Sequence, residues 1–444
     1  MTGLYMATLR QISQIMQALG ATRILLKPLS NNDNSKQQIY FGGNFEVIQD
    51  FPLGEIRADG ESSKGPIFKA PLKLFWITPE GETEEATGSQ IILYPKYPEI
   101  RLSGFLRGCS LAPGQIMKPP TSEERERYAS QKRGMILGLT DDKVFAYTGS
   151  WDEEISKEIQ EYTEQNQDKQ VLSVFYEYYS SLADSQGLLI EKLKDIYIKG
   201  PIRSRRLDKD GTVIFYEAPN GAGFTLECEF GIIPNGNASP DFLDWELKTR
   251  SKSSTPLMTP EPDIGLYRDS YANFMNTHAN RRQPHQLYFT AKHQTGIRNP
   301  ETHLTLFIEG YDLEKKKITL SEGGYFLKND NGEIAAGWTF SKLLNHWKKK
   351  HTKTCYVSYT NLKIEGSTYY QFGPKVSLAK GASIEKFLDA LSTGIVVHDP
   401  GCKYALDQNT GKWKQKKRNQ FRVSAGNSAC LYDEYKELDL SSEE

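Results

Sequence analysis

The sequence predicts an α/β protein in which a domain with a mixed central sheet flanked by helices follows a β-rich N-terminal domain and a helical linker. Three observations predict this architecture. Residues 1–120 hold short β-like runs separated by Gly, Pro, Asn and Asp clusters. Residues 121–195 are charged and helix-prone, which indicates a connector. From residue 196 to 444, strand-like and helix-like segments mix, which is typical of an α/β domain.

The composition is that of a globular chain with room for two or three domains. Of 444 residues, 38% are hydrophobic and 25% charged, so packed cores are expected rather than disorder. No window offers the roughly 20 apolar residues of a membrane span, and the N-terminus lacks the pattern of a secretory signal. The five cysteines are scattered without CxxC or zinc-site spacing, which favours a reduced, cytoplasmic protein.

The N-terminal domain begins with a predicted short helix over Thr8–Leu19, followed by strand-like runs such as IYFGG and SQIILYP. Between two of these strands lies the polar loop NNDNSKQQ, residues 31–38. Its side chains can hydrogen-bond to bases and phosphates, or they can simply form turns. Composition alone leaves both interpretations open.

The segment that carries the most chemistry is residues 221–250, GAGFTLECEFGIIPNGNASPDFLDWELKTR. If 242–250 is a strand, its period of two places Glu246 and Lys248 on one face and the intervening apolar residues on the other. Asp241 then lies at the entrance of the strand, and Glu227 lies upstream on a likely helix.

Phosphodiester hydrolysis needs such a set of side chains. Carboxylates bind a hard cation such as Mg²⁺ through oxygen, the metal polarises the phosphoryl group, and a lysine orients or deprotonates water. By itself the pattern also fits an edge strand that carries a surface Glu/Lys pair. Asp244, on the same face as Glu246, could also take the place of Asp241.

Residues 221–260 resemble restriction endonucleases of the MvaI/BcnI family, a branch of the PD-(D/E)xK nucleases that also includes the mismatch-repair nicking enzyme MutH. The resemblance rests on a Gly-rich turn, then TLE on a helix, then SPDFLDWELK. It extends more loosely over PLMTPEP, QLYFTAK, GWTFSKLLNHWKKK, FLDALSTGIVVHD and FRVSAGNSACLYD. Where related enzymes often carry a His-rich segment before the last of these, this chain has KKRNQ, so recognition specificity does not carry over.

The resemblance implies a PD-(D/E)xK core and a Mg²⁺-dependent DNA endonuclease, with Mn²⁺ able to substitute, acting on double-stranded DNA in restriction or phage defence. It assigns metal binding to Asp241 and Glu246, support of the metal shell to Glu227, and positioning of the attacking water to Lys248. Two alternatives stay open: a nicking repair endonuclease of the MutH type, and a DNA-binding module that no longer cuts. A protein partner or a homo-oligomer is also compatible with the sequence.

Basic residues outside this segment are candidates for DNA contact. The run GKWKQKKRNQFR, 411–422, carries six bases and no acid around Trp413, and it is either a DNA-contacting segment or a solvated loop. Its candidates, together with two arginines upstream, are Lys412, Lys414, Lys416, Lys417, Arg418, Arg281 and Arg282.

The remaining basic residues and histidines are either weaker candidates for function or are expected to be structural. Arg203, Arg205 and Arg206 form a second basic group. The histidines His278, His285 and His293 lack metal-site spacing and are expected to be structural. Lys292 is a further active-site candidate by resemblance. Lys348–Lys350 are expected on the solvated face of a helix whose apolar side is Leu343, Leu344 and Trp347.

The pattern K-x-L-S-x-N-D near the N-terminus is faintly similar to the effector domain of EcoRII, a B3-like β-barrel that binds DNA. That similarity implies a DNA- or effector-binding role for residues 1–120. A chain starting near Asp184 keeps Glu227, Asp241, Glu246 and Lys248, so we expect it to retain the whole nuclease domain.

Overall fold

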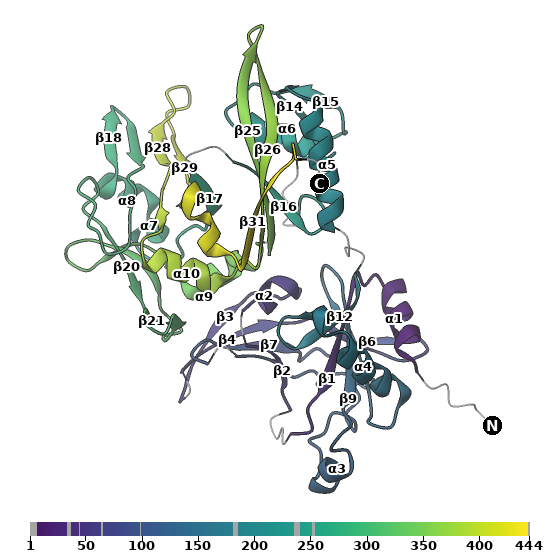
Figure 1. Cartoon of the computed structure of the whole chain (residues 1–444). Helices are drawn as coiled ribbons and strands as arrows, with labels where there is room; N and C mark the ends of the chain where they lie inside the picture. The colour runs from purple at the N-terminus through teal and green to yellow at the C-terminus, as the bar shows by residue number, and fades with distance from the viewer. Residues whose placement is uncertain are drawn as a thin grey trace. The chain divides into compact units, whose positions relative to one another are not determined.

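The computed structural model of the chain describes residues 7–32, 37–43, 45–63, 65–97, 99–180, 185–234, 240–250, 254–350 and 352–442, without the side chains of Ser180 and Arg282. The chain divides into two compact units, Met1–Ala183 and Asp184–Glu444. Both contain helices and sheets (Figure 1). The second unit begins at Asp184, upstream of residue 196, where the sequence predicted that the mixed α/β domain starts.

Two sheets form the first unit. The larger runs in the order β11 (Gln170–Val171), β12 (Phe175–Ser180), β1 (Arg23–Leu29), β9 (Arg133–Leu139), β10 (Val144–Gly149), β5 (Leu74–Ile77) and β6 (Thr83–Glu85). The smaller runs β2 (Ile39–Gly42), β8 (Glu99–Ser103), β7 (Gln90–Tyr94), β4 (Gly65–Pro71) and β3 (Arg57–Ser62). The β-rich character predicted for the N-terminal region is confirmed.

Two helices cover one face of the larger sheet. The predicted N-terminal helix is confirmed as α1 (Leu9–Ala18), and the Thr8 hydroxyl caps it by accepting from the Gln11 backbone N–H. Apolar residues of α1 and of α4 (Glu154–Gln165) share a buried cluster with Ile24 and Leu26 of β1. Because side chains alternate along a strand, Leu25 and Lys27 point to the opposite face of the same sheet.

The segment expected to be a helical linker differs from that expectation. Residues 121–195 do contain helices, namely α3 (Ser122–Arg127), α4 and α5 (Ser185–Ile198). They also supply β9, β10 and β12 to the larger sheet of the first unit. Every residue of β9 is buried, so the strand has no polar face that could show an alternating pattern. Within the loop 31–38, residues 33–36 lie outside the described residues.

The main sheet of the second unit is mixed, as predicted. Its order is β13 (Ile202–Arg203), β26 (Ser367–Lys380), β25 (Lys353–Ile364) and β16 (Trp245–Arg250), and β31 (Glu434–Asp439) also pairs with β26. Strand β16 runs parallel to β25, and the other pairs are antiparallel. Figure 1 shows β25, β26 and β31 side by side, with α5 and α6 (Gly221–Glu229) on one side of them.

The core of this sheet lies under α5 and α6. Leu189 and Leu193 of α5 and Leu226 of α6 pack with Trp245 and Leu247 of β16. On the opposite face, Glu246 and Lys248 of β16 lie beside Thr354 and Tyr356 of β25 in the strand register. One face of the sheet therefore supports the fold, and the other carries polar chemistry.

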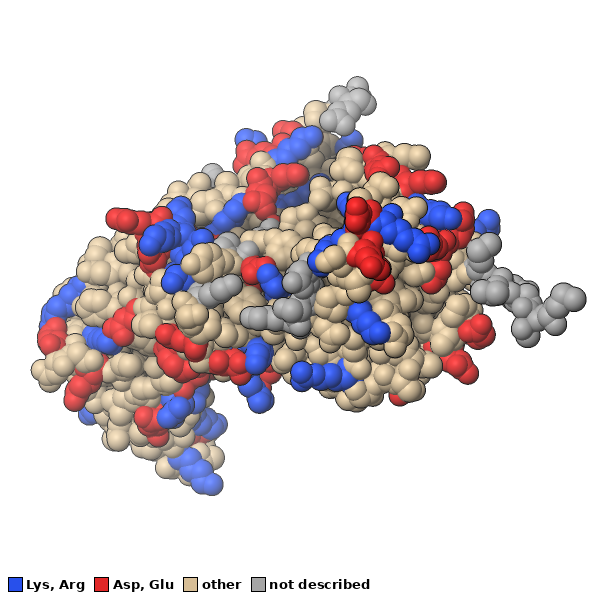
Figure 2. Space-filling view, turned by 90° about the horizontal axis from the view of Figure 1, so that it is seen from below, with Lys and Arg blue, Asp and Glu red and all other residues tan. Residues whose placement is uncertain are grey.

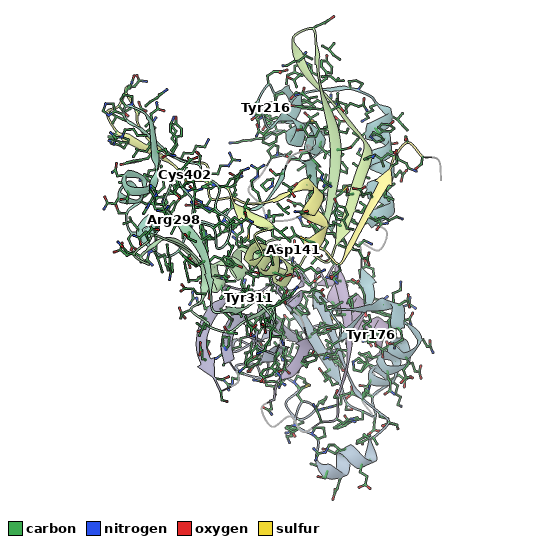
Figure 3. The ribbon with its side chains drawn as sticks, turned by 60° about the vertical axis from the view of Figure 1, so that its left-hand side comes forward. Asp141, Tyr176, Tyr216, Arg298, Tyr311 and Cys402 are labelled. Carbon is green, nitrogen blue, oxygen red and sulfur yellow. The ribbon has the colours of Figure 1, made fainter. Side chains whose placement is uncertain are left out.

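Smaller sheets complete the second unit. They are β17 (Ser254–Met258) with β30 (Phe421–Ser424) and β27 (Val396–His398); β20 (Thr305–Glu309) with β23 (Gly324–Lys328) and β24 (Ile334–Thr339); and β18 (Asn280–Gln283) with β19 (Gln286–Phe289), β28 (Cys402–Leu406) and β29 (Trp413–Lys416). The helices among them are α7 (Leu266–Asp269), α8 (Tyr271–His278), α9 (Phe340–Trp347) and α10 (Ile384–Ser392), with the short helix η2 (Ala425–Leu431) and the hairpins β14–β15 (Arg205–Leu207, Val213–Phe215) and β21–β22 (Tyr311–Asp312, Lys317–Ile318). Cys402 marks the start of β28 in Figure 3.

No helix in the described part of the chain is both long and apolar enough to cross a membrane.

Candidate active site

Strand β16 presents Glu246 and Lys248 away from the apolar core. Trp245 and Leu247 are buried and Glu246 and Lys248 are half-buried, so the predicted alternation is confirmed. The strand starts at Trp245 and not at residue 242, because Phe242 and Trp245 close a tight turn through backbone hydrogen bonds of 3.0 and 2.9 Å. Leu243 adopts a left-handed φ of 54° in this turn.

The turn returns Asp241 to the outer edge of β16. Strand β25 occupies one side of β16, and among the described strands none pairs with the other side. The Asp241 Oδ2 atom accepts a hydrogen bond of 2.8 Å from the Leu247 backbone N–H, between Glu246 and Lys248 in the chain. Asp241 is thereby fixed beside the residues that sequence spacing paired with it.

Asp244, the alternative to Asp241, is engaged elsewhere. Its carboxylate forms an ion pair with Lys353 at the start of β25. The charges of Glu246 and Lys248 act on Asp241. The geometry favours Asp241 as the carboxylate of the site.

Helix α6 carries two glutamates with different surroundings. Glu229 is buried and accepts from Arg205 Nε at 3.1 Å and from Lys199 Nζ at 3.0 Å. Desolvation opposes ionisation of Glu229, but these two cations hold its pKa below the usual value. Glu227, two residues earlier, instead feels the charges of Asp241, Lys248 and Glu246. Glu229 therefore forms ion pairs with Arg205 and Lys199, whereas Glu227 is the glutamate within electrostatic reach of Asp241, Glu246 and Lys248.

The electrostatics of the site reflect crowded acidic groups. Burial, followed by the charge of Asp241, raises the pKa of Glu227. Burial, followed by the charge of Glu246, raises the pKa of Asp241, although the Leu247 N–H and the Lys248 ammonium act against the rise. Lys248 Nζ donates to Glu246 Oε1 at 2.5 Å. One lysine thus only partly offsets three neighbouring carboxylates.

A small cavity opens beside Glu246 and Lys248. Its volume of ≈ 60 Å³ can hold an ion or a few waters, since a single water needs about 10–15 Å³. Residues of β25, of η2 and of the segment after α9 also line it, among them Thr354, Tyr356, Tyr432 and Lys350. Sequence reasoning missed all four.

Lys350 corrects one of our expectations. Leu343, Leu344 and Trp347 are the buried side of α9, as predicted. The three lysines that follow were expected to be solvated. Lys349 is exposed, but Lys348 and Lys350 are half-buried, and Lys349 and Lys350 both line the cavity. Burial and the nearby charge of Lys248 lower its pKa, while Glu246 raises it. A second cation therefore lies within electrostatic reach of the site.

The donors suit a hard divalent cation. Among the described residues, no three His, Cys, Asp or Glu side chains are arranged as a ready metal site. Mg²⁺ does not require one, because it usually takes one or two carboxylates and completes its shell with substrate phosphate and water. Burial and neighbouring carboxylate charge raise the pKa values of Glu227 and Asp241, and a bound cation would offset both effects. The residues present therefore fit Mg²⁺.

Comparison with known proteins identifies the family of the chain. The model of the MvaI/BcnI restriction endonuclease family matches residues 190–432, more than half of the chain. The chain belongs to this family. Membership makes it a DNA-cleaving hydrolase of the type II-like restriction class.

Two solved structures are similar to the MvaI/BcnI-family chain. One is the restriction endonuclease MvaI in complex with its cognate DNA substrate, at 18% identity and a TM-score of 0.45 over 58% of this chain and 99% of that chain. The other is MvaI in the absence of DNA, at 14% identity and a TM-score of 0.33 over the same shares. No curated protein matches the chain.

In this MvaI/BcnI-family protein, four of the predicted basic candidates lie on one four-stranded sheet. Arg281 and Arg282 lie on β18 at one edge, and Lys414 and Lys416 lie on β29 at the other. Lys416 pairs in register with Lys403 of β28, which in turn pairs with Tyr288 of β19. Strand alternation therefore places Lys403, Lys414 and Lys416 on one face. We name this group the β28–β29 lysines.

Some of the basic candidates are engaged by neighbouring groups. Lys414 forms an ion pair with Asp407. Lys417 Nζ lies 5.2 Å from the centre of the Tyr271 ring, a cation–π contact. Lys412 and Arg418 are exposed, as is Arg281, and the side chain of Arg282 lies outside the described residues. Figure 2 shows both signs of charge intermixed over the visible face of the molecule, so binding surfaces must be identified from local groups.

The basic group near residue 205 and Lys292 do not line the cavity beside Glu246 and Lys248. Arg205 is committed to Glu229, Arg203 stacks at 3.8 Å over the Phe215 ring, and Arg206 lies 5.5 Å from the centre of the Tyr216 ring, labelled in Figure 3. Lys292 is exposed and follows β19 in a different sheet from β16. It does not line the cavity.

Two of the three histidines are buried, in line with the structural interpretation. His293 is fully buried, and its Nε2 lies 2.8 Å from the Thr302 hydroxyl. Its backbone pairs with that of His398, which is also fully buried. His278 is buried on α8, whereas His285 is exposed with a left-handed φ of 64°. Burial, followed by the charge of His278, lowers the pKa of His293 to about 4.

This histidine should contribute to the acid sensitivity of the second unit together with His398 and His346, whose pKa values burial also lowers. The folded pKa of about 4 lies below the ordinary value of 6.5, so the unfolded state binds the proton first. The stabilisation is complete above pH 6.5 and is lost as pH falls through 4, by about 3 kcal/mol in total. We expect His293→Gln to reduce, but not to abolish, the pH dependence of the protection of β27 against hydrogen exchange between pH 7 and 4.5, because His398 and His346 remain. An equal slope in both proteins would assign the acid sensitivity to other groups.

Proposed function

We propose that the protein is a Mg²⁺-dependent endonuclease that hydrolyses phosphodiester bonds of double-stranded DNA through a PD-(D/E)xK site, in restriction of foreign DNA or phage defence. The observation that carries the proposal is the convergence of Glu227, Asp241, Glu246 and Lys248 around the free edge of β16. The five cysteines are free, in keeping with a cytoplasmic setting.

Asp241 and Glu246 would hold the metal, and Glu227 would complete the acidic shell. They come from three local structures: the turn before β16, the strand itself and helix α6. A metal held by all three would tie the helix to the edge of the sheet. When bound, a divalent cation supplies Lewis acidity to the scissile phosphoryl group. Mn²⁺ presents similar chemistry to oxygen donors and should substitute.

Lys248 would position the attacking water and offset charge that develops on the phosphate. Its ammonium is held by Glu246 at 2.5 Å, so its place does not depend on substrate. Lys350 adds positive charge on the same side of the sheet. Hydrolysis then needs no covalent intermediate on the protein, because water is the nucleophile.

The test is digestion of supercoiled, unmodified plasmid and phage DNA by the purified chain with Mg²⁺, Mn²⁺ or EDTA. Linear product in Mg²⁺ and Mn²⁺ but not in EDTA supports the proposal. Accumulation of nicked circles without linear product indicates the MutH-like nicking alternative. DNA binding by gel shift with no cleavage in either metal would instead identify a module that no longer cuts.

We also propose that the β28–β29 lysines contact DNA phosphates. Replacing Lys403, Lys414 and Lys416 by Gln should weaken binding to all duplexes alike. The slope of log K against log salt should become shallower by about 0.9 for each phosphate that is no longer neutralised. Gel shifts in EDTA at several salt concentrations measure both quantities.

Lys315→Gln is the matched control for this experiment. Its side chain is 75% exposed and pairs with Asp312, away from the β28–β29 lysines. An unchanged slope in the triple variant would show that these lysines form an ordinary solvated face.

A further inference from the structure

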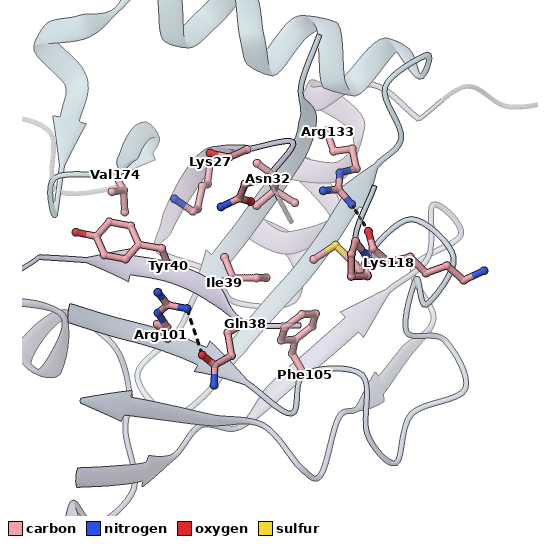
Figure 4. A pocket seen from close by; sticks show the side chains of 14 residues that line it. Lys27, Asn32, Gln38, Ile39, Tyr40, Arg101, Phe105, Lys118, Arg133 and Val174 are labelled. Carbon is pink, nitrogen blue, oxygen red and sulfur yellow. Dashed lines mark hydrogen bonds between the residues drawn. The ribbon is translucent and has the colours of Figure 1, made fainter. Parts of the chain in front are cut away.

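The first unit contains a cavity that the nuclease chemistry does not use. Its volume is ≈ 330 Å³, within the range of roughly 300–1,000 Å³ that small-molecule sites occupy. Strands β1, β2, β8 and β9 contribute to its wall, so both sheets of the unit take part. Figure 4 shows Lys27, Asn32, Gln38, Arg101 and Arg133 around it.

The wall is basic. None of the described lining residues is acidic. Four are cationic, namely Lys27, Arg101, Lys118 and Arg133. Arg101 is balanced by Glu99, whose Oε1 accepts from its Nε at 2.8 Å. No carboxylate of the described chain lies within ion-pairing distance of Lys27 or Arg133. The cavity therefore has an excess of positive charge.

Lys27 is the least expected of these cations. It is 8% exposed, on the inward face of β1, and its Nζ has ring contacts instead of a hydrogen-bond partner among the described residues. These rings belong to Phe175, at 5.4 Å, and Tyr40, at 6.0 Å. Burial, followed by the charge of Lys132, lowers its pKa to about 8. A buried ammonium without a counter-charge is costly unless an anion completes the site.

Arg133 is also buried, and neighbouring groups hold it in place. Its Nη1 donates to the Lys118 carbonyl at 3.0 Å, and its guanidinium lies 4.8 Å from the Trp151 ring centre. Within the described chain, its Nε has no hydrogen-bond partner. Trp151 is in turn fixed by a 2.9 Å hydrogen bond from its Nε1 to Asn31 Oδ1. The cation is thus preorganised by groups that need not move when a ligand arrives.

The remaining lining groups suit a planar ring with polar edges. Tyr40 and Phe105 offer aromatic faces, and Tyr40 is 39% exposed. The amide of Asn32 can donate to and accept from the edge of a base, and Gln38 is engaged by Arg101, whose Nη1 donates to Gln38 Oε1 at 3.4 Å. Buried cations, aromatic faces and amides together match the three parts of a nucleotide: phosphate, base face and base edge.

We propose that this cavity binds a single nucleotide, with Lys27 and Arg133 on its phosphate and Tyr40 against its base. The source is either a free nucleotide or one extruded from DNA. Only the second source rests on the proposed function, because only that source requires the chain to engage DNA.

The first arm of the test uses the full chain in EDTA with dAMP, dGMP, dCMP, dTMP and inorganic phosphate, followed by calorimetry. We expect saturable binding of at least one nucleotide, and about tenfold or greater weakening in Lys27→Met and in Tyr40→Ala. Lys73→Gln, an exposed lysine of the same unit, should bind as the unchanged chain does. Thermal unfolding of each variant identifies loss of fold, and Tyr40→Ala, at an exposed residue, keeps the test valid if Lys27→Met unfolds.

The second arm uses duplex DNA with a mismatched 2-aminopurine, because a mismatched base costs least to extrude. A rise in fluorescence that Lys27→Met abolishes supports an extruded nucleotide, whether or not free nucleotides bind. Binding of free nucleotides without that rise supports a free ligand. The proposal would be overturned if inorganic phosphate bound as tightly as every nucleotide. It would also be overturned if neither nucleotide binding nor the fluorescence rise changed in Lys27→Met and Tyr40→Ala. Plasmid cleavage by the same variants reports on the nuclease site separately.

Discussion

Asp241→Asn and Lys248→Ala are each expected to lose plasmid cleavage in Mg²⁺ by about a thousandfold while the fold and most DNA affinity persist. Asparagine is the sharper replacement for Asp241, because its side-chain oxygen can still accept from the Leu247 N–H while the charge is removed. A loss of activity then reports on the missing carboxylate and not on a disordered strand edge. Single-turnover cleavage, gel shift in EDTA and thermal unfolding measure the three quantities.

Asp244→Asn is the matched control. This residue is three positions away on the same turn, but it is paired with Lys353. It should lose far less activity than Asp241→Asn. If Asp244→Asn alone abolished cleavage, Asp244 would be the metal ligand. Cleavage by Lys248→Ala at the rate of the unchanged protein would remove the lysine from the proposed mechanism.

Lys350→Met is expected to reduce the single-turnover rate by about a hundredfold, with a smaller effect on DNA affinity. Methionine keeps the length and apolar stem of the side chain, so it removes mainly the charge. Lys350 lines the cavity beside Glu246 and Lys248, where, under the proposed function, negative charge would develop on the phosphate during hydrolysis. Loss of one preorganised donor at such a position typically costs a hundredfold or more in rate.

Lys342→Met controls for the loss of a lysine on α9 itself. This residue lies two turns earlier and does not line the cavity. It should cleave at a rate close to that of the unchanged chain. Equal behaviour of the two variants would mean that Lys350 contributes only to the general positive charge of the surface.

The part of the site that the sequence predicts depends on local geometry. Glu246 and Lys248 share a face because a strand alternates, and this needs no knowledge of the partner strand. The predicted start of the strand, residue 242, was wrong because Phe242 and Trp245 form a turn. Asp241 nevertheless lies beside β16 as predicted, because it is only a few residues away in the sequence. The fold class followed in the same way from local patterns.

The missing residues depend on tertiary pairing. Tyr356 lies beside Lys248 only because β16 and β25 run parallel in one register, across more than a hundred residues of chain. Nothing local distinguishes Lys350 from the two lysines before it. Strand β9 was hidden for a related reason, because a short run that is buried on both faces cannot be told from a helix by its period.

The bond between Asp241 and the Leu247 N–H also bears on how this protein avoids association with other chains. An edge strand with unpaired backbone donors is a template for pairing with another strand. On the outer side of β16 one such donor is covered by Asp241, a residue assigned to catalysis. A residue at position 241 that cannot accept this hydrogen bond would leave the Leu247 N–H unpaired at the strand edge, in addition to removing a carboxylate. Asp241 would therefore protect the edge of β16 as well as serve the proposed cleavage, and Asp241→Ala should aggregate more readily than Asp241→Asn.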